Sequence, residues 1–227
     1  MSDDNPNEDF GNIPEDLDLS GGYVVDDDDW DNVAPAAEGG FDRRAWVKWN
    51  PKDTDKNPVT VRVRVCEPPY RVYKHNEMGR NPYYCTRYVF GHNAQGQFDR
   101  VDTGEPCDRC DEPDAKYPSL RGFAPVIVRD EAGDHAAQAE MSATILGGLL
   151  QFVKDPDWRK DYPHSRDLLR DVDLKVTMKP DGKGYDVVPA RQPVKLTDKE
   201  KAMIADLDFD PKSFIERMLE KQGGNNE

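Results

Sequence analysis

Negative charge is concentrated at one end of the chain, and this separates a segment that cannot build a core from one that can. Fourteen of the 45 acidic residues lie in residues 1–42, which contain no Lys or Arg, so residues 43–227 carry 31 acidic and 31 basic side chains. Segments rich in charge and poor in large apolar residues bury too little surface to offset the entropy lost on ordering. We therefore predict a disordered acidic tail over residues 1–42 and a folded body after it.

The predicted tail contains one apolar stretch beside its densest block of charge, "GGYVVDDDDWDNV". Apolar residues next to a charge block are typical of tails that dock onto another surface. The residues that would do so are Asp26, Asp27, Asp28, Asp29, Trp30 and Asp31. A tail that only keeps the protein soluble is the alternative interpretation.

Composition also excludes some classes of protein. No apolar run reaches the 18 or more residues of a membrane helix, and the acidic N-terminus is unlike a signal peptide. We expect a soluble, cytoplasmic protein without a membrane partner. With only four cysteines, two of them in a Cys-x2-Cys pair, a metal site is favoured over disulfides.

The body combines short strands with helices near its end. The pattern predicts strands at 45–50, 59–66 and 122–130, hairpins at 82–101 and 171–190, a helix at 142–155, and two C-terminal helices that start at Thr197 and Asp210. This order favours a mainly β fold, a small barrel with helical appendages.

The strand at 59–66 alternates strictly between valine and arginine. Val61, Val63 and Val65 share one face, and Arg62 and Arg64 share the other. We expect the arginine face to lie toward solvent or a polyanion rather than in the core.

A metal site is predicted from the spacing of the cysteines. Cys107 and Cys110 are separated by two residues, which lets both thiolates reach one tetrahedral ion. Cys85 is the expected third ligand and His75 the fourth, with His92 and Cys66 as alternatives for the fourth position. We predict one structural Zn²⁺.

The same letters permit an enzyme interpretation. His75-x-Glu77 with a later Pro-Cys-x2-Cys is the signature of zinc deaminases, in which both motifs open helices. Pro82 would break the first of these helices in its second turn, and a deaminase site would leave Cys85 without a role. We therefore expect no catalysis.

Basic and aromatic residues alternate between residues 43 and 100. Single-stranded nucleic acid is bound by this mixture, because cations follow the phosphates while rings stack on bases. The candidate contacts are Trp46, Lys48, Trp49, Arg62, Arg64, Tyr70, Arg71, Tyr73, Lys74, Tyr84, Arg87 and Tyr88.

The strand "VRVRVCEPP", a following His, a Cys, the "CDRC" pair, "GFAPVIVRD", a helix and "DLKVTMKPDGKGYDVVPA" occur in this order. The arrangement resembles the single-stranded-DNA-binding proteins of tailed bacteriophages, of the T-even helix-destabilising type. The resemblance implies a five-stranded OB-fold core over residues 43–196, with an inserted zinc subdomain at about 70–115 and C-terminal helices over 197–227. It also implies one His and three Cys as ligands, in the order His75, Cys85, Cys107, Cys110.

These features together predict a sequence-nonspecific protein that protects and unfolds single-stranded DNA during phage replication and recombination in the infected cell. The acidic tail would compete for the DNA cleft or recruit replication and recombination proteins. The alternatives are a zinc-ribbon adaptor that binds RNA polymerase or another protein and, less favoured, a zinc-dependent cytidine or deoxycytidylate deaminase.

Overall fold

The computed structural model describes residues 46–49, 60–76, 83–92, 98–131, 133–180, 182–190 and 193–223. The predicted acidic tail, residues 1–42, lies outside these described residues.

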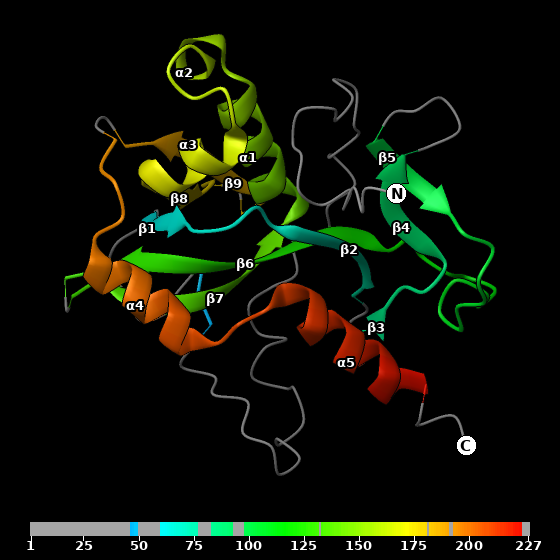
Figure 1. Cartoon of the computed structure of the whole chain (residues 1–227). Helices are drawn as coiled ribbons and strands as arrows, with labels where there is room; N and C mark the ends of the chain where they lie inside the picture. Colours follow the sequence, from blue (N-terminus) through cyan, green and yellow to red (C-terminus); the bar gives the residue numbers. More distant parts are fainter. Residues whose placement is uncertain are drawn as a thin grey trace, which may run out of the picture.

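The described part of the chain is mainly β with some helices, as the sequence predicts (Figure 1). The strands are β1 (Thr60–Val65), β2 (Tyr70–His75), β3 (Tyr83–Tyr84), β4 (Tyr88–His92), β5 (Phe98–Asp102), β6 (Ser119–Arg129), β7 (His135–Ser142), β8 (Leu174–Met178) and β9 (Tyr185–Pro189). The helices are α1 (Ala143–Lys154), α2 (Pro156–Arg159), α3 (Ser165–Asp171), α4 (Asp198–Leu207) and α5 (Pro211–Gly223).

The long strand β6 organises a seven-stranded sheet. Residues 126–128 of β6 pair with both β1 and β7, and residues 121–123 pair with both β2 and β7. Since a strand has only two edges, β1 and β2 follow one another along the edge opposite β7. After the three helices α1 to α3, β8 returns to the free edge of β1. Counting β1 and β2 together as one position, the spatial order is β8, then β1 and β2, then β6, then β7. This is the order of a Greek key.

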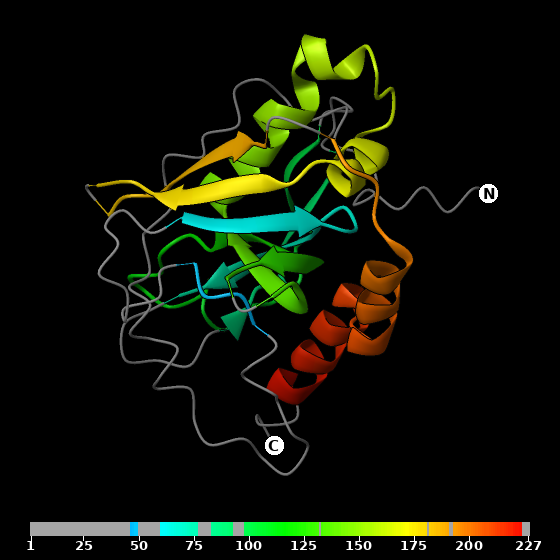
Figure 2. The ribbon, with the colours of Figure 1, turned by 90° about the vertical axis from the view of Figure 1, so that its left-hand side faces the viewer.

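The expected five-stranded barrel is not closed. Closure would require β7 to meet β9, and these strands are not paired in the described part of the chain. Instead, α1 lies against β9, β6 and β7. Figure 2 shows α1 and α2 above β1 and β8, α3 beside the end of these strands, and α4 and α5 at the lower right. The predicted strand at 45–50 is reduced to a single bridge between Trp46 and Gln138 within the described residues 46–49.

Two glycines let α1 approach the sheet closely. A Cβ on Gly148 would lie 2.7 Å from the Cβ and Cγ2 atoms of Val187 in β9, and a Cβ on Gly122 would lie 2.6 Å from Leu146 of α1. Both distances are far inside van der Waals contact. Gly148, which weakens helix propensity over 142–155, is therefore required by packing.

Replacing Gly148 with Ala is expected to destabilise the protein by about 1 to 2 kcal/mol. The clash with Val187 cannot be relieved by a flexible side chain, and its cost exceeds the gain in helix propensity of about 1 kcal/mol. The free energy of unfolding from a urea titration measures the change. Gly223→Ala is the matched control, because nothing lies within 4 Å of its added Cβ. A Gly148→Ala protein as stable as the control would contradict the close approach.

The C-terminal helix α5 is attached through a second cluster of aromatic rings. Phe214 of α5 lies 5.7 Å from Phe123 of β6 and 5.6 Å from Trp46, measured between ring centroids. The side chain of Gln222 also accepts from the backbone N–H of Tyr84 at 2.7 Å and donates to its carbonyl at 3.1 Å. These two bonds occupy the outer edge of β3 as a neighbouring strand would.

The expectation that the arginine face of β1 lies toward solvent is wrong for Arg64. Its side chain is 2% exposed, and its Nε donates to Asp173 at 2.6 Å. Arg62, half exposed, binds the same carboxylate at 2.8 Å. The segment before α4 covers Arg64, because the Arg64 guanidinium also donates to the carbonyl of Val194. The predicted alternation of side chains in β1 agrees with the structure. The sequence of the strand alone does not show that the segment before α4 covers its outer face.

Candidate metal centre

The hairpin of β2 and β3 brings the first two candidate ligands together. His75 is the last residue of β2 and pairs with Tyr83 of β3, and Cys85 follows β3 directly. The backbone N–H of Cys85 donates to the carbonyl of Tyr73 at 2.9 Å, which extends the pairing by one step. Two ligands ten positions apart in sequence are thereby fixed side by side on regular backbone.

Cys107 and Cys110 lie on a turn that follows β5. The N–H of Asp111 donates to the carbonyl of Cys107 at 3.1 Å, which closes the turn. Backbone N–H groups also point at sulfur: that of Tyr88 lies 3.3 Å from the Cys85 Sγ, and those of Cys110 and Thr86 donate to the thiol of Cys107. Such N–H donors stabilise thiolates, the form that binds a metal ion.

The four ligand atoms form a compact group of the right size for one ion. All lie within 4.8 Å of one another. The Cys85 Sγ is 3.8 Å from that of Cys107 and 3.6 Å from that of Cys110. The His75 Nε2 lies 3.6 Å and 3.4 Å from these last two sulfurs. A tetrahedron with corners about 2.3 Å from its centre has edges of roughly 3.8 Å, so the spacing fits tetrahedral coordination.

The electrostatic interactions of the three cysteine side chains favour a cation between them. Burial raises the pKa of the Cys85 thiol and of the Cys110 thiol, while at Cys107 burial is outweighed by backbone N–H donors and the pKa is lowered. Three thiolates this close repel one another unless a positive ion lies between them. The group can hold one metal ion, with His75, Cys85, Cys107 and Cys110 as its ligands.

The alternative ligand Cys66 lies elsewhere. Its thiol is buried beside the carbonyl of Arg64 at 3.6 Å, and burial raises the pKa of this thiol to about 12. It is a small buried side chain in the junction between β1 and β2. The other alternative, the side chain of His92, lies outside the described residues.

In the described residues, the Cys107–Cys110 pair does not lie on the helix that a deaminase site requires. Cys107 and Cys110 lie on a turn, and no α-helix occurs in residues 98–118, all of which are described. Glu77, the residue that would act on the metal-bound water, and Pro82 lie outside the described residues. The four side chains together could supply all the ligands of one tetrahedral ion.

The candidate ligands Cys85, Cys107 and Cys110 and the β4–β5 hairpin form a module, defined here as residues 83–92 and 98–118, that is joined to the main sheet through β3. The guanidinium of Arg71 in β2 lies over the ring of Phe90 in β4, 4.3 Å from its centroid, and both side chains are buried. Figure 1 shows this hairpin at the far end of β2. Together with His75, this contact ties the module to one strand of the sheet.

Half of the predicted nucleic-acid contacts are buried. The buried six are Trp49, Arg64, Arg71, Tyr73, Lys74 and Tyr84. Lys74 pairs with Glu140 at 2.8 Å, and the Trp49 indole N–H donates to the carbonyl of Glu140 at 2.6 Å. These contacts hold the fold together and leave no surface for a base or phosphate. For these six residues, the expectation from composition is corrected.

The other six reach the surface to different extents. Lys48 and Arg62 are exposed, and Trp46, Tyr70, Arg87 and Tyr88 are partly buried. Arg87 pairs with Asp111 at 2.8 Å, within the module. The sequence-based set did not include Tyr117, which is 72% exposed.

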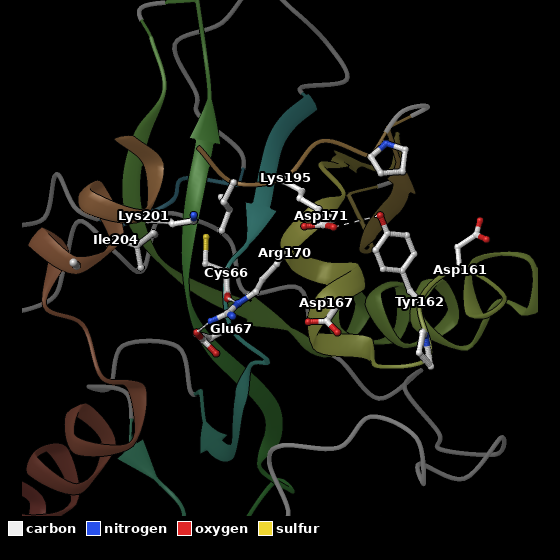
Figure 3. A pocket seen from close by; sticks show the side chains of 14 residues that line it. Cys66, Glu67, Asp161, Tyr162, Asp167, Arg170, Asp171, Lys195, Lys201 and Ile204 are labelled. Atoms are coloured by element: carbon white, nitrogen blue, oxygen red, sulfur yellow. Dashed lines mark hydrogen bonds and ion pairs between the residues drawn. The ribbon is translucent and has the colours of Figure 1, made fainter. Parts of the chain in front are cut away.

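A cavity of about 930 Å³ lies between α3, α4 and the junction of β1 with β2 (Figure 3). Glu67, on its wall, pairs with Arg170 and with Arg166, and the Tyr162 hydroxyl donates to Asp171 at 3.4 Å. The ion pairs of Glu67 join the junction of β1 with β2 to α3.

No helix in the described part of the chain has both the length and the apolar character needed to cross a membrane. In comparisons with known proteins, no family model matches the chain, and neither a curated protein nor a solved structure is significantly similar to it. The resemblance to phage single-stranded-DNA-binding proteins therefore stays a prediction.

Proposed function

We propose that the protein binds single-stranded DNA without sequence preference and that a structural Zn²⁺ braces it. The set of one imidazole and three thiolates is typical of zinc, because soft ligands in a closed tetrahedron select this ion over Mg²⁺ or Ca²⁺. All four coordination positions would be filled by the protein, which leaves none for a reacting water. The proposed role is binding, without catalysis.

One topological observation carries the proposal. The module with the candidate metal ligands is inserted between the first and second strands of a Greek key, counting β1 with β2 as the first strand and β6 as the second. Three helices then separate the third strand from the fourth. An OB-fold is a partly open Greek-key barrel of five strands, and its loops between strands 1 and 2 and between strands 4 and 5 bind oligonucleotides. An open OB-fold with a zinc subdomain in the first of these loops fits this arrangement.

Exposed basic residues support the choice of a polyanion as ligand. Arg62 of β1 and Lys175 of β8 are directly opposite one another on the outer face of the sheet. Lys179 and Lys183 flank the turn between β8 and β9, which corresponds to the second oligonucleotide-binding loop, and both are exposed. Two acidic residues lie beside this group, since Asp186 is 3.7 Å from Lys179 and Asp173 pairs with Arg62 at 2.8 Å. The local excess of positive charge would attract a phosphate backbone.

The acidic segment is proposed to act on the same surface. With fourteen acidic and no basic residues, residues 1–42 are a polyanion that can compete with DNA for the basic face. Once DNA displaces it, the segment would be available to replication or recombination proteins of the phage in the host cytoplasm.

Titration of the full-length protein with fluorescent oligo-dT at 50 and 200 mM salt tests this function. If about four phosphates are neutralised, affinity is expected to fall about fiftyfold between the two salt concentrations, since each contributes roughly 0.7 to the logarithmic slope. A variant lacking residues 1–42 should bind more tightly than the full chain at 50 mM, with a smaller difference at 200 mM. Absence of salt-dependent binding in both proteins would favour the protein-binding adaptor instead.

A further inference from the structure

The module of residues 83–92 and 98–118 exposes a group of two tyrosines with an arginine between them. The Arg100 guanidinium lies over the ring of Tyr117, 4.5 Å from its centroid, and over that of Tyr88, 5.1 Å from its centroid. The two ring centroids are 6.1 Å apart. Tyr117 is 72% exposed and Arg100 is exposed, so the group lies at the surface.

The strand register explains how the group forms. Phe90 is directly opposite Arg100 in the β4–β5 ladder, and Tyr88 is two residues before Phe90. All three side chains therefore lie on one face of the hairpin, with Tyr88 diagonal to Arg100. Phe90 is buried against Arg71 of the main sheet, whereas Tyr88 and Arg100 continue toward solvent. On this face Phe90 is buried in the core, and Tyr88 and Arg100 contact the exposed ring of Tyr117 on the segment before β6.

The chemistry of the group points to an unpaired base. One face of the Tyr117 ring is covered by Arg100, and most of the side chain is open to solvent, which suits stacking of a flat aromatic ligand. The carboxylates Asp99, Asp102 and Asp111 lie in the same module, so phosphate attraction is not its main contribution. A stacking site of this kind takes any base, but only one that is not paired within a duplex.

We propose that Tyr88, Arg100 and Tyr117 form a stacking subsite for a nucleobase of single-stranded DNA. The inference rests on the proposed function and adds the place at which bases, rather than phosphates, are held. Arg100 acts as a positioning residue, because its guanidinium contacts both rings, whose planes are inclined by 56° to each other. The basic outer face of β1 and β8 would follow the phosphates, and the module would hold the bases.

Binding of oligo-dT by Tyr117→Ala tests the subsite. Affinity is expected to fall about five- to hundredfold, while the slope of affinity against salt stays that of the unchanged protein, because stacking releases no counterions. Tyr117→Phe should bind as the unchanged protein does, since the ring is kept. Val89→Ala is the control, because Val89 is exposed on the opposite face of the same strand.

The outcomes separate the subsite from the function. If the unchanged protein fails to bind oligo-dT, the proposed function is wrong. If it binds and Tyr117→Ala binds equally well, or if Tyr117→Phe is as weak as Tyr117→Ala, the stacking subsite is wrong while the function stands. Photo-crosslinking with an oligonucleotide that contains 5-iododeoxyuridine should label Tyr117 or Tyr88. Labelling confined to other residues would also overturn the subsite.

Discussion

Replacing Cys107 with Ser is expected to reduce bound metal from about one ion per chain to near zero. A serine hydroxyl does not ionise near neutral pH, so the cluster would lose one of three anionic ligands and the tetrahedron would open. Metal content of the purified protein, measured by mass spectrometry of the element, checks the first effect. The identity of the element in the unchanged protein tests the assignment to zinc.

Loss of the ion should also loosen the module more than the main sheet. Without the ion, only contacts such as that of Arg71 with Phe90 fasten the β4–β5 hairpin. Amide hydrogen exchange is expected to rise in β4 and β5, while β6 and β7, the longest pair of strands in the described sheet, keep their protection.

Cys66→Ser is the matched control for the metal experiment. Cys66 is a buried cysteine outside the cluster, so this variant should keep one ion per chain and show only a modest loss of stability. A Cys107→Ser protein that still carries one tightly held ion would disprove the proposed set of ligands.

Capping residues and turn formers in the sequence predict the helices and hairpins that are determined by neighbouring residues. The helix at 142–155 is α1 with Ser142 as its N-cap, and the predicted capping box of Thr197 with Glu200 starts α4. The hairpin at 171–190 is β8 with β9, and that at 82–101 contains β4 with β5. Each depends on residues close together in sequence, such as caps and turn formers.

Sequence patterns do not identify strands whose formation depends on contacts between distant segments of the chain. The strand β2, "YRVYKH", was not predicted, because both of its faces are buried and its polar residues find partners far away, such as Glu140 for Lys74. The strand β7 was also missed, although Ala137, Ala139 and Met141 alternate there with polar residues. Small alanines give a weak hydrophobic signal, but the period of two was present and could have identified this strand.

The four residues predicted as metal ligands lie together in the fold, whereas six of the twelve predicted DNA contacts are buried. Ligand spacing is a local property at Cys107 and Cys110, and four residues with soft donor atoms seldom gather without a reason. Exposure of an arginine or a tyrosine depends on what the rest of the chain places over it. Arg64 and Tyr117 show this in opposite directions, because the segment before α4 covers Arg64 while Tyr117 stays 72% exposed.

Replacing Asp173 with Asn is expected to destabilise the protein by about 3 to 5 kcal/mol, because the buried Arg64 forms its ion pair with this carboxylate. Asp173 is 5% exposed and binds Arg62, Arg64 and Arg129. Arg129 also pairs with Asp134 and Glu200. Arg62 can turn to water, but Arg64 would stay buried with an uncompensated charge. The free energy of unfolding in urea measures the loss. Asp186→Asn, on the exposed face of β9, should cost less than about 1 kcal/mol. Equal stability of the two variants would mean that the buried arginines are neutralised by other groups.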